Sequence, residues 1–234
     1  MNTSAQILEG GVVKVEGRLV DASNATLFTE IELDGQSVRA IYKPISGERP
    51  LWDFQSGTLA FRERAAYLLS EAMGFHLVPL TILRDGPFGE GAFQLWIDID
   101  EDVDLALYFK EVNENLRKVA LFDAVINNTD RKIGHLLPVQ NGHLYVCDHG
   151  VTFHEEDKLR TVLWQWSGQP LNTDEIAILI SLKDLVKDGL ITELPQLLSE
   201  IEIDALLMRV DRLISESTFP EPNPEWPAVP WPPF

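Results

Sequence analysis

The sequence predicts an α+β protein with an antiparallel, β-rich N-terminal lobe and a mainly helical C-terminal lobe. From residue 12 to residue 43, apolar and polar residues alternate and are interrupted by turn sequences. After the acidic run Asp98–Asp104, apolar residues recur at helical spacing instead. The last 16 positions (219–234) hold too many prolines for a helix or a central strand. We therefore expect lobes at residues 1–98 and 99–218, followed by a proline-rich tail at 219–234.

The N-terminal lobe reads as three strands, a helix and two further strands. Turn sequences at DASNA (21–25) and at Asp34-Gly35 divide the first three strands. Thr58 can cap a helix that runs to Met73, and Gly74 can end it. The expected strands are Val12–Val20, Thr26–Leu33, Ser37–Lys43, Leu77–Arg84 and Ala92–Ile99.

The C-terminal lobe begins with a helix, a polar loop and a hairpin. The turn pair Asn141-Gly142 joins two apolar runs and predicts the hairpin, which places Asp130 and Asp148 at the two ends of one ribbon. Helices are expected at Asn115–Asn127 and within Thr173–Asp188, Ile191–Ile203 and Asp204–Glu216. The tail is expected to be extended, and either packed through its tryptophans or mobile.

Composition narrows the class of protein. The formal net charge of −18 disfavours binding to nucleic acid or to an anionic membrane surface. The single cysteine, Cys147, excludes an internal disulfide framework and is expected to be a packed thiol. No apolar run is long enough for a membrane span, and no signal peptide is recognisable. We expect a cytoplasmic protein.

Lys43 and Glu63 form the first candidate pair. Lys43 ends the third strand, and Glu63 falls on the apolar stripe of the following helix. A carboxylate that faces inward needs a partner, because burying it unpaired is costly. A lysine on the neighbouring sheet can supply that partner. The alternative is a local pair between Glu63 and an arginine.

Asp130 and Asp148 form the second candidate pair. Asp130 follows a helix and is crowded by polar residues and two cations, whereas Asp148 leaves a buried-looking strand. One carboxylate at a nucleophile and one that holds a metal are what phosphoryl transfer requires. Each aspartate alone has a structural alternative. A zinc site built from His135, His149, His154 and Asp148 is a minor alternative, since the spacing follows no zinc pattern.

Taken together, these residues resemble the phosphatidylinositol 3- and 4-kinase-like branch of the protein-kinase fold, and within it a group of small bacterial proteins of uncharacterised substrate. The stretch FDAVINNTDR (122–131) is also similar to the catalytic loop of HipA-type kinases. The resemblance spans Val12 to Gln169 and leaves the tail uncovered. It implies a two-lobed kinase-like fold and an ATP- and magnesium-dependent phosphotransferase, with manganese as a possible replacement.

The resemblance also implies a role for each matching residue. Lys43 would contact the nucleotide phosphates and pair with Glu63, Asp130 would orient the acceptor hydroxyl or take its proton, and Asp148 would bind magnesium. The turn with Ser23 and Asn24 would cover the phosphates, although such turns are common in any hairpin. The connection between lobes would present its backbone to adenine, and the segment His149–Trp164 would correspond to an activation loop. The connection consists of Gln94, Leu95, Trp96 and Ile97, and the cations offered to an anionic substrate are Lys158 and Arg160.

One position departs from the pattern. Lipid kinases of this branch carry an asparagine metal ligand five residues after the catalytic aspartate, where this chain has His135. Imidazole is a poorer magnesium ligand than an oxygen donor, so Asn128 is an alternative second ligand. A pseudokinase that binds nucleotide without turnover, or an enzyme that transfers AMP, therefore stays open. The acceptor is expected to be a protein or a small molecule rather than a lipid, and the tail can dock a protein.

Overall fold

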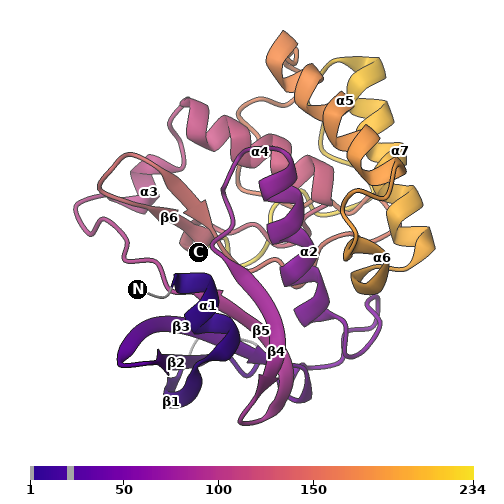
Figure 1. The fold of residues 1–234 in the computed structure, drawn as a ribbon. Helices are drawn as coiled ribbons and strands as arrows, with labels where there is room; N and C mark the ends of the chain where they lie inside the picture. The colour runs from indigo at the N-terminus through magenta and orange to yellow at the C-terminus, as the bar shows by residue number, and fades with distance from the viewer. Residues whose placement is uncertain (1–2, 20–23) are drawn as a thin grey trace.

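The computed structural model describes residues 3–19 and 24–234 and has an antiparallel sheet followed by a mainly helical part (Figure 1). The sheet order is β1-β2-β3-β5-β4, and every neighbouring pair is antiparallel. The strands are β1 (Val12–Arg18), β2 (Leu27–Leu33), β3 (Gln36–Pro44), β4 (Thr81–Gly86) and β5 (Gly89–Leu95). The fold class expected from the sequence is confirmed. The division into residues 1–98, 99–218 and 219–234 stays a prediction.

The fourth and fifth strands differ from their expected bounds. Both lie closer to the turn at Pro87-Phe88, and Leu77 and Val78 lie before the start of β4. Instead, the amides of Leu77 and Val78 donate to the Ser70 hydroxyl of α2 (Leu59–Ala72), at 2.7 and 3.2 Å. The Ser70 side chain thus accepts the hydrogen bonds that the amides of Leu77 and Val78 would otherwise have donated to a neighbouring strand.

The sequence analysis missed the first helix, α1 (Ser4–Gly10). Thr3 and Gln6 form a reciprocal capping box at its start, and Ile7 and Leu8 bury the apolar side against the sheet. The sequence feature that predicts this helix is Thr3 followed three residues later by Gln6, directly before the apolar pair Ile7-Leu8.

The helical part is built from α4 (Glu114–Ile126), α5 (Thr173–Lys187) and α7 (Glu200–Glu216), with the short helices α3 (Leu105–Tyr108) and α6 (Leu194–Leu197). Two three-residue 3₁₀ turns, Ile45–Gly47 and Ile133–His135, lie in the loops, and β6 (Leu136–Pro138) pairs with β7 (Leu144–Val146). The two or three helices expected after residue 172 are present as α5, α6 and α7, but the expected division between residues 203 and 204 is wrong. Ser199 and Glu202 form a capping box that starts one long helix there.

Two hydrophobic cores hold these layers together. The smaller core joins α1 to the sheet, and the larger core joins α4, α5 and α7. Helix α2 belongs to the larger core through Ala65, Ala66 and Leu69, although it precedes β4 in the chain. Glu63 on α2 is therefore fixed relative to both the sheet and the helical part.

The tail packs against the helical part. Phe219 is buried, and the carbonyl oxygen of Ala228 accepts hydrogen bonds from the Thr161 amide at 3.0 Å and from Trp164 Nε1 at 2.9 Å. The chain ends near β6, in the middle of the view (Figure 1). Within the described residues, no helix is both long and apolar enough to cross a membrane.

Candidate active site

A cavity of about 230 Å³ brings the two candidate pairs together. It lies where β3 and the start of α2 face two loops of the helical part. We call these loops the Asp130 loop (residues 127–132) and the Asp148 loop (residues 147–151). The polar or charged side chains that line the cavity belong to Asn24, Thr26, Lys43, Glu48, Glu63, Asp130, Lys132, His135 and Asp148.

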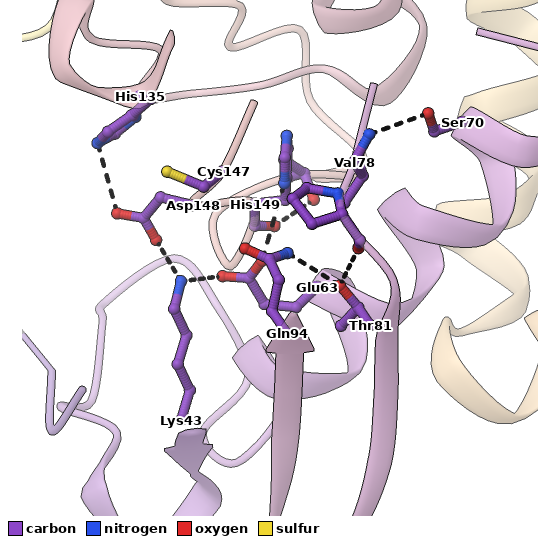
Figure 2. A network of polar contacts seen from close by, with 12 residues as sticks. Lys43, Glu63, Ser70, Val78, Thr81, Gln94, His135, Cys147, Asp148 and His149 are labelled. Atoms are coloured by element: carbon purple, nitrogen blue, oxygen red, sulfur yellow. Dashed lines mark hydrogen bonds and ion pairs between the residues drawn. The ribbon is translucent and has the colours of Figure 1, made fainter. Parts of the chain in front are cut away.

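Lys43 is bound by two carboxylates (Figure 2). Its Nζ donates to Glu63 and to Asp148 Oδ1, the latter at 2.9 Å. The Glu63 side chain is 3% exposed, whereas that of Asp148 is 53% exposed and lines the cavity. Strand, helix and loop thus meet at one ammonium group, and the alternative in which Glu63 pairs only with an arginine is wrong.

The charges of this cluster reinforce one another. Burial alone would lower the pKa of Lys43, but the Asp148 and Glu63 carboxylates outweigh it and raise the pKa above its usual range. The Lys43 ammonium in turn is the main cause that lowers the pKa of Asp148. Glu63 is buried, which favours its neutral form, yet Lys43 holds its pKa well below the ordinary value. All three groups are ionised at neutral pH.

The Asp148 loop carries local backbone strain. Asp148 follows β7 and has a φ of 63°, in the left-handed region that residues other than glycine seldom adopt. The preceding carbonyl, that of Cys147, accepts a 2.8 Å hydrogen bond from Arg131 Nη1. Burial raises the pKa of the Cys147 thiol to about 12, so it is neutral and a poor nucleophile.

Asp130 stands opposite this cluster and is flanked by cations. Lys132 Nζ lies 3.4 Å from Asp130 Oδ2, and Arg160 Nη2 lies 3.3 Å from Asp130 Oδ1. Burial raises the pKa of Asp130, while Lys132 and Arg160 oppose that shift. A carboxylate of this kind can accept a proton from a bound hydroxyl group.

A buried ionic network that sequence reasoning missed supports both loops. Arg131 and Asp123 are fully buried, and the Arg131 guanidinium binds the Asp123 carboxylate at 2.9 to 3.2 Å. Arg131 Nη2 also lies 2.8 Å from His149 Nε2. Asp123 lies on the apolar face of α4. A buried carboxylate needs a cationic partner, so this position in the sequence could have predicted a buried ion pair.

His149 extends the network to Glu63. Arginine only donates, so His149 Nε2 is the acceptor and the ring proton lies on Nδ1, which is 3.8 Å from Glu63 Oε2. Burial lowers the pKa of His149 and keeps the ring neutral. Contacts therefore run from Asp123 through Arg131 and His149 to Glu63 and Lys43.

Asn128 does not act as a metal ligand in this arrangement, which corrects the sequence-based expectation. Its side chain is buried, its Nδ2 donates to Asp123 Oδ1, and its Oδ1 accepts from the Asp130 amide, both at 3.0 Å. Both polar ends are used in shaping the loop.

The residues expected to contact adenine do not line the cavity. Gln94 is buried, and its amide group donates to Thr81 Oγ1. The Leu95 amide donates to the Leu80 carbonyl and the Trp96 amide to the Arg39 carbonyl, because these bonds extend the pairing of β5 with its two neighbours, β4 and β3. Ile97 follows them outside the cavity lining. Two of the expected backbone donors are therefore already paired.

Lys158 is also placed differently from the expectation. Its ammonium is buried between the rings of Trp52 and Trp226, at 4.8 and 5.1 Å, and lies 3.2 Å from Asp53. It anchors segment 149–164 and is not free for an anionic substrate. Arg160 does lie at the site, beside Asp130.

The turn expected to cover phosphates is described only in part. Ser23 lies outside the described residues. Asn24 lines the cavity, and its Oδ1 accepts from the Arg49 amide at 2.8 Å.

The donors at the Asp148 end suit a magnesium ion that arrives with phosphates. His135 Nε2 lies 3.5 Å from Asp148 Oδ2, and burial lowers the pKa of His135 to about 4, so the ring is neutral. Among the described residues, no three His, Cys, Asp or Glu side chains are grouped to hold a metal, which rules out the zinc set there. Magnesium commonly uses one or two protein carboxylates and completes its shell with phosphate oxygens and water. Asp148 fits that role.

Fold and site together define the class of this protein: an α+β chain with a lysine–carboxylate cluster between its sheet and its helices. The chain belongs to the same family as Protein Rv2133c of Mycobacterium tuberculosis (strain ATCC 25618 / H37Rv). The two are 40% identical over 263 aligned positions, which cover 97% of this chain and 94% of the relative. No protein-family model matches the chain.

One solved structure that aligns with the chain is a Helicobacter pylori proinflammatory kinase, CtkA. The match covers 90% of this chain and 93% of the kinase, at 12% identity and a TM-score of 0.48.

Proposed function

We propose that this protein is an ATP- and magnesium-dependent phosphotransferase of kinase-like fold. The observation that carries the proposal is the cluster of Lys43, Glu63 and Asp148, which shares one cavity with Asp130. Phosphoryl transfer requires positioned cations at the phosphates and one carboxylate at the acceptor, with little covalent chemistry by the protein.

Each residue of the site has a separate role in the proposed transfer. Glu63 and the buried network behind it hold Lys43 extended into the cavity, where its ammonium can bind phosphate oxygens. Asp130 orients the acceptor hydroxyl and takes its proton while the acceptor oxygen bonds to the γ-phosphorus and the bond to the β-phosphate oxygen breaks. A magnesium ion at Asp148 would neutralise phosphate charge. Lys132 and Arg160 would steady the Asp130 carboxylate through the same step.

The presence of His135 favours a second candidate function, that of a pseudokinase. His135 stands where the resemblance places an asparagine ligand, and Asn128, which is buried and does not line the cavity, is not positioned to replace it. Nucleotide would then bind at Lys43 without turnover.

One experiment separates these functions. The protein is incubated with ATP labelled at the γ- or the α-phosphate, with magnesium or manganese, and the label is followed while binding is measured by calorimetry. We expect ATP to bind and the γ-label to be released or transferred. Binding without turnover would indicate the pseudokinase, and transfer of the α-label would indicate an AMP-transferring enzyme. No binding with either metal would refute the proposal.

A further inference from the structure

The end of the tail lies at the cavity. Phe234 is one of the residues that line it, together with Asp130 and Lys132. The adjacent carbonyl, that of Pro233, accepts a 2.9 Å hydrogen bond from the Ile133 amide. The Phe234 side chain is 61% exposed, so its ring forms part of the rim of the cavity.

Three earlier contacts hold the tail in this position. Trp226 lies against the Lys158 ammonium, and the Ala228 carbonyl accepts from the Thr161 amide and from Trp164 Nε1. The tail therefore runs along segment 149–164 before it reaches the Asp130 loop. Its prolines restrict the backbone, which lowers the entropy lost when the tail docks.

Phe234 lines the cavity beside Ile133 and Gly134, which directly follow the Asp130 loop. Lys43, Glu63 and Asp148 mark the phosphate side, so an acceptor hydroxyl has to approach Asp130 from elsewhere. Lys132 contacts Asp130 and lines the cavity, and Phe234 lines it beside the two residues that follow Lys132. An extended polypeptide that followed segment 149–164 to Asp130 would meet the docked tail, whereas a small molecule would not.

We propose that Phe234 is a specificity-determining residue that restricts the acceptor to a small hydroxyl-bearing molecule and excludes polypeptides. This inference rests on the function proposed above. Phe234 acts by occupying the rim, and the hydrogen bond from Ile133 to Pro233 keeps it there.

The test compares the full chain with Phe234→Ala and Trp231→Ala. Trp231 is an aromatic residue of the same segment but is 87% exposed and does not line the cavity, which makes it a matched control. A serine-containing peptide and glycerol serve as acceptor probes with γ-labelled ATP. We expect Phe234→Ala to raise the ratio of peptide to glycerol labelling about fivefold or more, which corresponds to ~1 kcal/mol of relieved steric exclusion. Trp231→Ala should leave the ratio unchanged.

Hydrogen exchange tests the docking without any turnover. The Ile133 amide should be protected in the full chain and lose that protection when residues 233 and 234 are removed, whereas the Thr161 amide, bound to Ala228, should keep its protection. Turnover with an unchanged labelling ratio in Phe234→Ala, or an Ile133 amide that exchanges freely in the full chain, would overturn the role of Phe234 alone. A lack of ATP binding in every variant would overturn the proposed function and this inference with it.

Discussion

Single residues at this site gain their properties from the groups around them. Asp130 is an ordinary loop aspartate in sequence, but burial raises its pKa and two cations hold it in place. Lys43 is an ordinary strand lysine, but two carboxylates fix its ammonium. These surroundings lead to two predictions at the residue scale.

Asp130→Asn is expected to lower turnover by about 10²- to 10⁴-fold, because an amide cannot take the acceptor proton. Its affinity for ATP should change less than about twofold, since the phosphate contacts lie on Lys43. Steady-state kinetics and calorimetry measure the two effects. Asp85→Asn, at an exposed position, is the control and should behave like the wild type. Unchanged turnover in Asp130→Asn would remove Asp130 from the reaction.

Asp123→Asn is expected to destabilise the protein by about 3–5 kcal/mol, because it leaves the buried Arg131 guanidinium without its counter-ion. Urea unfolding measures this loss. Asp211→Asn removes the partner of a partly exposed lysine, Lys183, and should cost far less stability, because surface ion pairs contribute little. Equal losses in the two variants would contradict the importance assigned to the buried pair.

At the scale of elements, the end of α4 holds segment 149–164. Asn127 ends the helix with a φ of 51°, and its side chain bonds to the carbonyls of His154 and Glu156 and to the amide of Lys158. The backbone conformation and the side-chain contacts can be separated, since glycine adopts a positive φ without strain.

Asn127→Gly should therefore keep the helix end but lose about 1–3 kcal/mol of stability, through the lost hydrogen bonds. The Lys158 amide should lose its protection from hydrogen exchange. Ser217→Gly, at the corresponding end of α7 with a φ of 55°, is the matched control and should be close to neutral. If Asn127→Gly were as stable as the wild type, the side chain would not be the anchor.

At the scale of the whole molecule, the ion cluster joins the sheet to the helical part, and its charge links that junction to pH. Lys43 lies on β3, Glu63 on α2 and Asp148 in a loop after β7. Lys43 holds the pKa of Glu63 below the ordinary value of 4.5. A depressed carboxyl pKa contributes stability above pH 4.5 that is lost as the pH falls toward the folded-state value.

The wild type should therefore exceed Glu63→Gln in unfolding free energy near neutral pH, and the difference should shrink as the pH falls below 4.5. Urea unfolding of both proteins from pH 7 to pH 3 measures it. Glu71→Gln, on the exposed side of α2, should show a difference that is small throughout. A difference for Glu63→Gln that stayed constant over this range would contradict the linkage.

The sequence alone determined the antiparallel meander, helix α2 and an inward-facing Glu63 that needs a cationic partner, and the structure decided that this partner is Lys43. These features follow from local periodicity, turn residues and the cost of an unpaired buried carboxylate, all of which are visible along the chain. It also determined that Asp130 and Asp148 lie at the ends of one ribbon, because the hairpin turn is local.

Only the tertiary structure decided the contacts between distant segments. The network of Asp123, Arg131 and His149, the burial of Lys158 and the position of Phe234 all join residues whose separation along the chain carries no periodic signal. The amides of Leu95 and Trp96 likewise donate to carbonyls of neighbouring segments, those of Leu80 and Arg39. Partner choice for a polar group depends on which segments packing brings within hydrogen-bond distance, and that is a property of the folded chain.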